Sequence, residues 1–200
     1  MPKKEITPAT PAAVVFTDET LRKAADRAAA AYRPVWIGRS GEQSSGEAVA
    51  RHLEATLALL DKDGWVRTLD FSTMWSTSSP GLVDVTETTT VKTMLKSVIR
   101  FLKDEFGDGD HDPSRDLFTA LCHVGDSGAH GDSDTARIAG DVLDLVIRAH
   151  TGANAAFATR WSERLNRTHA DITALLTAGA KFARTYGPGA GASLPETSAA

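Results

Sequence analysis

The stretch WSERLNRTHADITALLTAGAKFARTYGP, residues 161–188, decides the fold class. Thr168 and Asp171 have the spacing of a helix capping box. After this start, apolar residues recur at intervals of three and four: Ile172, Leu175, Leu176, Phe182, Ala183 and Tyr186. Gly187 and Pro188 end the pattern, because neither residue favours a continued helix. The stretch therefore predicts a terminal helix that places one side in a core.

Five segments upstream repeat this combination of a capping residue, a helical apolar period and a stop signal. They are residues 17–34, 44–65, 89–107, 112–125 and 132–152. Their apolar residues recur at three and four positions rather than at the two-residue interval of a strand. The sequence thus predicts an all-α protein, a compact bundle of about six helices.

The helix boundaries and buried faces can be predicted in more detail. The expected N-terminal caps are Thr17 or Asp18, Ser44 in a capping box with Glu47, Asp112 before Pro113, and an acid at 132–134. Gly140 is expected to permit close contact between helices. In the segment at 112–125, Cys122 is expected to be a reduced thiol in the core. The other expected buried residues there are Leu117, Phe118 and Leu121.

Residues 66–90 resist the helical interpretation, because they are rich in threonine, serine and β-branched residues around a Pro-Gly turn. We expect a long loop that could contain a β-hairpin. Trp75 gives this loop an apolar tip together with Met74 and Phe71. The tip could close over a binding groove, or it could be a flap that covers the core, which is the interpretation we favour.

Composition predicts a single helical domain at residues 17–186 between two tails. Proline, alanine and threonine in residues 1–16 indicate a flexible N-terminal tail, and residues 187–200 indicate a disordered C-terminal tail. The apolar runs are far shorter than the roughly 20 residues that cross a bilayer. We therefore expect no membrane contact and a cytoplasmic location.

Charge is distributed unevenly along the chain, although the net charge is only −4. Residues 104–144 contain eleven acids and two arginines, whereas residues 155–186 contain five bases and two acids. The bases could grip phosphates in a helix-turn-helix-like pair, but the acidic pI of 5.8 argues against a nucleic-acid-binding domain. Alternatively, they pair with the acidic half of the domain. The residues concerned are Arg160, Arg164, Arg167, Lys181 and Arg184.

A metal site is a further hypothesis. His123, Asp126, His130 and Asp132, with Asp134 nearby, could converge on one ion across a glycine-rich turn. The same acids could instead cap a helix and offset its dipole without an ion. No glycine-rich phosphate loop, CxxC pair or nucleophile with a visible base is present. The sequence therefore indicates no cofactor.

Two stretches resemble a family of short, uncharacterised helical proteins from actinobacteria and their phages. HLEATLALLDKDGW at residues 52–65 is similar to the early motif LxxALxLLxxxGW. The late motif, W-(N/S)-(D/E)-x-x-x-R-T-x-x-D-(V/I), is matched by Trp161, Ser162, Glu163, Arg167, Thr168, Asp171 and Ile172. The resemblance implies a bacterial or phage intracellular helical domain and supplies no reaction. Independently of it, Trp161 followed by Arg167 and a capped helix would lock a helical corner, with Arg167 bonding carbonyls or an acid nearby.

These observations favour a non-enzymatic protein-binding or regulatory module that binds a protein partner or associates with itself through its opposed charges. A nucleic-acid-binding protein is the first alternative, and a metal-dependent enzyme is the second. Trp75, Trp161 and the five bases are the candidate binding residues.

Overall fold

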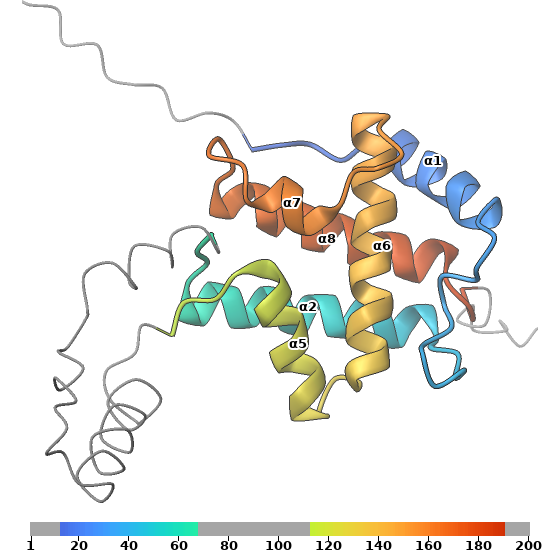
Figure 1. Cartoon of the computed structure of the whole chain (residues 1–200), viewed down its shortest axis with the longest axis horizontal. Coiled ribbons are helices and arrows are strands. Elements are labelled where there is room, and N and C mark those ends of the chain that lie inside the picture. Colours follow the sequence, from blue (N-terminus) through green and yellow to red (C-terminus); the bar gives the residue numbers. More distant parts are fainter. Residues whose placement is uncertain (1–12, 68–112, 191–200) are drawn as a thin grey trace, which may run out of the picture.

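The computed structural model describes residues 13–67 and 113–190, and their regular elements are helices. The helices are α1 (Asp18–Ala29), α2 (Gly46–Asp63), α5 (Leu117–Ser127), α6 (Ser133–Thr151), α7 (Ala158–Ser162) and α8 (His169–Tyr186). The prediction of an all-α fold with about six helices is confirmed (Figure 1). The helix predicted at 89–107 and the loop residues 68–90, including Trp75, lie outside the described residues.

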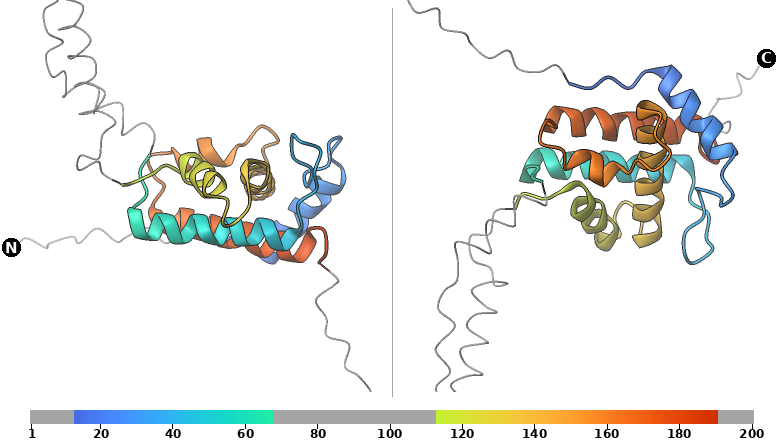
Figure 2. Two further views of the ribbon diagram at one scale, coloured as in Figure 1. Left: turned by 90° about the horizontal axis from the view of Figure 1, so that it is seen from below. Right: turned by 45° about the horizontal axis from the view of Figure 1, so that its top comes forward.

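The antiparallel pair formed by α2 and α8 is the base of the domain. At one end, the backbone N–H of Gly46 donates to the carbonyl of Pro188 at 2.9 Å. At the other end, His169 lies 3.4 Å from the carboxylate of Asp61. Helices α5 and α6 lie across one side of this pair, α7 packs against α5 and α6, and α1 packs against α6 and α8 at the end of the pair (Figures 1 and 2). The core therefore lies between the α2–α8 layer and the crossing helices.

One glycine sets how closely α6 approaches the base layer. A Cβ atom on Gly179 of α8 would lie 2.6 Å from Leu143 Cδ2 and 3.1 Å from Leu53 Cδ1. Gly140 on α6 was expected to serve this purpose, but that prediction is wrong because a Cβ there would meet no atom within 4 Å. Gly140 faces open space, and the close contact belongs to Gly179.

Three predicted helix starts are confirmed. Thr17 caps α1 and Asp132 caps α6, each through a side-chain oxygen that accepts a hydrogen bond from the first turn. Thr168 and Asp171 form the predicted capping box at the start of α8. For α2, however, the cap is Ser45 rather than Ser44. No capping box forms there, because the residue three positions after Ser45 is an alanine, and Glu47 pairs instead with Arg51 of α2 and Arg184 of α8.

The start of α5 also differs from the prediction. The helix begins after Asp116 rather than after Asp112, and the Asp116 carboxylate accepts a hydrogen bond from the first turn. Just upstream, the backbone of Arg115 exchanges hydrogen bonds of 3.1 Å with residues 64 and 66, which follow α2. This pairing holds the chain extended, so Pro113 cannot be the first helical residue.

The segment before α1 lies against the domain. The backbone N–H of Val14 donates to the buried Asp171 carboxylate at 2.7 Å. The Phe16 ring lies 4.9 Å from His150 and 6.0 Å from Trp161 between ring centroids. Residues 13–16 thus contact α6, α7 and α8 although they belong to the predicted N-terminal tail. The domain limits at 17 and 186 and the two tails remain predictions.

Candidate binding groove

The corner between α7 and α8 contains the residues that carry the late sequence motif. Trp161 is buried, and the Arg167 guanidinium lies 4.2 Å from the centroid of its ring. The Asp171 carboxylate accepts hydrogen bonds from the Thr168 backbone at 2.9 Å and from Val14. These bonds hold the pKa of Asp171 below its usual range although burial acts in the opposite direction. The motif therefore forms a locked helical corner.

A different arginine makes the backbone bonds that were expected of Arg167. Arg67, which follows α2, donates to the carbonyls of Arg164, Leu165 and Arg167 at 3.4, 3.3 and 2.6 Å. Sequence reasoning missed Arg67 because its partners are about a hundred residues away and no local pattern marks it. Arg167 is half-buried against tryptophan, so its guanidinium serves this corner rather than an external ligand.

Two of the five candidate bases are exposed at the same corner. Arg160 lies on α7 with its guanidinium 5.6 Å from the Phe157 ring centroid. Arg164 lies in the turn that follows α7. Within residues 13–67 and 113–190, neither arginine forms an ion pair. Of the five bases that were predicted to bind phosphates, these two are therefore the ones still available to an external ligand.

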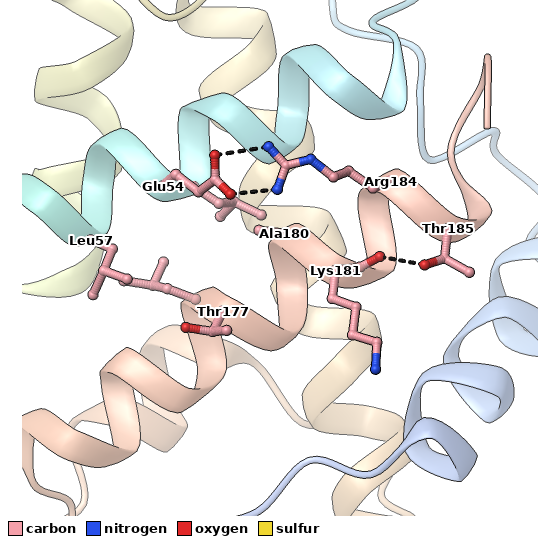
Figure 3. A pocket seen from close by; sticks show the side chains of 9 residues that line it. Glu54, Leu57, Thr177, Ala180, Lys181, Arg184 and Thr185 are labelled. Carbon is pink, nitrogen blue, oxygen red and sulfur yellow. Dashed lines mark hydrogen bonds and ion pairs between the residues drawn. The ribbon is translucent and has the colours of Figure 1, made fainter. Parts of the chain in front are cut away.

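The other two bases tie helices together at the far end of α8. Lys181 pairs with Asp18 of α1 at 2.6 Å. Arg184 pairs with Glu47 at 2.9 Å and with Glu54, both on α2, and these bonds raise the pKa of Arg184 further above neutrality. Figure 3 shows Arg184 and Glu54 beside a shallow hollow of about 430 Å³ between α2 and α8. These two bases are thus engaged with carboxylates, as the charge-pairing alternative predicted.

The packing of α8 also bears on the hypothesis that α7 and α8 form a helix-turn-helix-like pair. A recognition helix must present a free side to the major groove. Helix α8 instead packs against α1, α2 and α6, and half of its residues are buried. Its accessible side is the Lys181 and Arg184 surface described above. The arrangement leaves the exposed Arg160–Arg164 corner as the remaining basis for contact with nucleic acid.

The four candidate metal ligands differ in their surroundings, and only two of them have a structural role that can be named. Asp132 caps α6, accepting a 2.9 Å hydrogen bond from the first turn. His130 contributes its backbone carbonyl, which lies 2.9 Å from Nδ1 of the buried His52. His123 and Asp126 are exposed on α5. In the part of the chain that the structure describes, no three His, Cys, Asp or Glu side chains are grouped so that they could hold a metal ion. The metal-site hypothesis remains a prediction.

A second hollow, a groove of about 530 Å³, lies between α5 and α6, and we call it the α5–α6 groove. Its volume lies within the range of small-ligand and side-chain pockets. The start of α7 and the loop before α2 also line it, through Ala158, Thr159 and Arg39. Its apolar lining is formed by Leu117, Phe118, Leu121, Ala136, Leu143 and Ala158. Its charged lining is formed by Arg39, Asp126, Asp134, Arg137, Asp141 and Asp144.

Two residues predicted to lie in the core are instead on this groove. Phe118 is 62% exposed, so the prediction that it is buried is wrong. The residue adjoins Leu117, which faces α6, and successive positions on a helix point about 100° apart. Cys122 is half-buried on the same side of α5. Burial and the nearby carboxylates of Asp126 and Asp116 raise the pKa of its thiol, which therefore stays protonated and weakly nucleophilic at neutral pH.

Two acids of α6, Asp141 and Asp144, are partly buried in the groove. Asp144 accepts a 2.7 Å hydrogen bond from the backbone of Ala158 and lies 3.3 Å from Arg148. Asp141 has a single long ion pair among the described residues, 3.9 Å to Arg137 one turn earlier. Burial raises the pKa of both carboxyls in spite of these partners. Asp141 is therefore an acid with little direct compensation at the edge of an apolar groove.

The helices of the described residues include none that is long and apolar enough to span a membrane. Neither a curated protein nor a solved structure matches the chain. A family model does match, over residues 44–182, which is well over half of the chain. This agrees with the expected resemblance to an uncharacterised family, whereas the bacterial or phage source stays a prediction. The matched range begins just before α2 and ends within α8, so it includes α2, most of α8 and the residues of the α5–α6 groove other than Arg39. The chain thus belongs to the family described as "Family of unknown function (DUF6197)".

Proposed function

We propose that this protein is a non-enzymatic binding module that holds a protein partner in the α5–α6 groove. The observation that carries this proposal is Phe118, a large apolar side chain that is 62% exposed at the edge of a concave surface of about 530 Å³. Aromatic side chains beside pockets are typical anchors of protein interfaces. Covering the Phe118 side chain would contribute about 1–2 kcal/mol to an association, since burying a whole phenylalanine contributes about 1.5–3 kcal/mol.

The construction of the groove supports this proposal. Its floor consists of leucines and alanines from α5 and α6, whose other sides are fixed in the core. A floor that is already ordered loses little entropy on binding. The charged residues lie among and around this apolar floor, an arrangement that resembles the apolar core and polar rim of protein interfaces. A regulatory role would follow if the partner's activity changes on binding.

Site-specific photo-crosslinking tests the proposal. The photoreactive amino acid benzoylphenylalanine would replace Phe118 in the full chain in its source cells, with Tyr32 as the matched control position. Tyr32 is also aromatic and fully exposed, but it lies in the loop after α1 and is not one of the residues that line the groove. We expect a discrete protein adduct from position 118 that is absent from position 32. An identical adduct pattern at both positions, or none at either, would contradict the proposal. An adduct between two copies of this chain would identify self-association as the form of binding.

Nucleic-acid binding is the second candidate, and the exposed pair Arg160 and Arg164 favours it. The expected result is a duplex mobility shift at low salt that weakens steeply with added salt and disappears in the Arg160→Ala and Arg164→Ala double variant. The matched control is Arg22→Ala with Arg51→Ala, which removes the same charge from α1 and α2. If no shift occurs at low salt, this candidate is excluded.

A further inference from the structure

We infer that the α5–α6 groove recognises a lysine or arginine of a peptide segment that also carries a large apolar residue, with Asp141 receiving the cation and Phe118 contacting the apolar residue. This inference rests on the proposed function and names the chemistry of the partner. It follows from the charges of the groove, from the space beside Asp141 and from the apolar floor.

The charges that line the groove favour a cation. Four carboxylates face two guanidinium groups. Two of the carboxylates serve internal bonds. Asp134 accepts from the backbone N–H groups of Arg39 and Ser40 at 3.0 and 2.9 Å, and Asp144 accepts from the backbone of Ala158 at 2.7 Å. The other two are engaged less closely: Asp126 is exposed, and Asp141 has the long 3.9 Å pair with Arg137 and the weaker attraction of Arg148 and Arg33.

Asp141 is the better placed of these two acids. Asp126 is exposed near the C-terminal end of α5, where water screens its charge. Asp141 is half-buried in the middle of α6, and its pairing with Arg137 at 3.9 Å is too long for a strong charge-assisted hydrogen bond. Burial raises the pKa of its carboxyl although Arg137, Arg148 and Arg33 all act in the other direction. An additional cation at this carboxylate, whose side chain is 46% exposed, would compensate the part of its solvation that burial removes.

The residue before Asp141 provides the necessary space. A Cβ atom on Gly140 would meet nothing within 4 Å, so the surface of α6 is open there. The aliphatic stem of lysine or arginine can lie along an apolar surface while its charged end reaches an acid. Leu117 and Leu121 are nearly buried, so the stem would lie beside the half-buried Cys122. The exposed Phe118 ring would cover a neighbouring apolar residue.

Selection from a random peptide library on the immobilised full-length protein tests this inference. We expect the selected peptides to share a lysine or arginine close to a Phe, Trp, Leu or Met. The affinity of the consensus peptide, measured by fluorescence anisotropy, should fall about tenfold in Asp141→Asn, the loss that corresponds to about 1.4 kcal/mol. The matched control Asp26→Asn makes the same charge change at an exposed site on α1 and should alter the affinity less than twofold.

A double-mutant cycle makes the test independent of any folding defect. Replacing the lysine or arginine of the peptide by glutamine should cost a similar factor on the unaltered protein and little on Asp141→Asn, because both changes remove one interaction. If the two losses simply multiply, or if the selected peptides are acidic or uncharged, the inference is wrong.

The failure of this inference can be distinguished from that of the proposed function. Peptides that lose affinity in Phe118→Ala but not in Asp141→Asn would overturn the cation recognition and leave the groove as a binding surface. If no peptide is selected, or if binding is indifferent to Phe118→Ala, both proposals are overturned.

Discussion

The α2–α8 interface and the α5–α6 groove are built from the same kinds of residue but have opposite properties. In the former, Gly179 lets leucines of α2 and α6 approach so closely that a single added methyl group would collide with them. In the latter, Gly140 has open space above it. Phe182 is completely buried at the base of the domain, whereas Phe118 is mostly exposed.

The charges of the two regions differ in the same way. Glu47 and Glu54 of α2 pair closely with Arg184 of α8, so the ions strengthen a contact between helices. In the groove, Asp141 has one long ion pair among the described residues, 3.9 Å to Arg137, and Arg148 and Arg33 attract it from farther away. The ions between α2 and α8 pair closely across helices, whereas Phe118 and Asp141 of the groove stay accessible to a partner. This difference is the physical basis for assigning stability to the first region and binding to the second.

Removal of an aromatic ring should show the largest contrast between the regions. We expect Phe182→Ala to lower the free energy of unfolding by about 3–5 kcal/mol, because it leaves a cavity beneath Trp36 and Tyr186. Phe118→Ala should change it by less than about 0.5 kcal/mol, as an exposed substitution does. Urea unfolding followed by circular dichroism measures both values. Equal losses would mean that Phe118 is part of the core.

Two aspartates should respond to pH with opposite signs. Asp171→Asn should cost about 2 kcal/mol at neutral pH, because the buried carboxylate accepts several hydrogen bonds. The folded-state pKa of Asp171 is lowered, so its contribution is present above the unfolded value near 4 and is lost as the pH falls through the folded value.

Asp141 should behave in the reverse manner. Its folded-state pKa is raised, so the ionised carboxylate destabilises the fold at neutral pH and this cost disappears as the pH falls below the folded value. Asp141→Asn should therefore increase stability at pH 7 and flatten the pH dependence. Thermal unfolding of both variants between pH 3 and 7 provides the measurement, and shifts of the same sign at pH 7 would refute the contrast.

Glycine-to-alanine substitutions should change the stability of the fold in opposite directions in the two regions. Gly179→Ala should destabilise by about 1–2 kcal/mol, since overpacking against two buried leucines exceeds the gain in helix propensity. Gly140→Ala should stabilise by up to about 1 kcal/mol, because alanine favours the helix and meets no neighbour. Chemical denaturation of the two variants measures both changes in the free energy of unfolding. A loss of stability in Gly140→Ala would show that something packs over α6.

Arginine substitutions should give the smallest effect. Arg184→Gln is expected to lower stability by about 0.5–1 kcal/mol, since it breaks two ion pairs on a partly exposed surface. Arg164→Gln should have no measurable effect on stability, because its exposed side chain bridges no helices. Added salt should reduce the difference between the two variants. A difference that is insensitive to salt would indicate packing rather than ion pairing.

The candidate site illustrates where sequence reasoning fails. The apolar period at 112–125 predicts a helix correctly, but Phe118 was placed on its buried side because an isolated sequence does not tell how wide that side is. The long-range bonds of Arg67 to the α7–α8 corner join residues a hundred positions apart and leave no local trace. Asp141 appeared only as one acid among eleven, since its partial burial depends on the surrounding fold and not on its own segment.

The sequence by itself determined that the chain is helical and where several of its helices begin and end. Periodicity, the Thr168–Asp171 capping box and terminal glycines act over a single turn, so they can be recognised without the fold. Only the tertiary structure decided which glycine lies in a close contact, which phenylalanine is exposed and which arginines pair with acids. Those properties depend on what other segments place opposite a residue, and that is set by the packing of α2, α6 and α8 rather than by any local pattern.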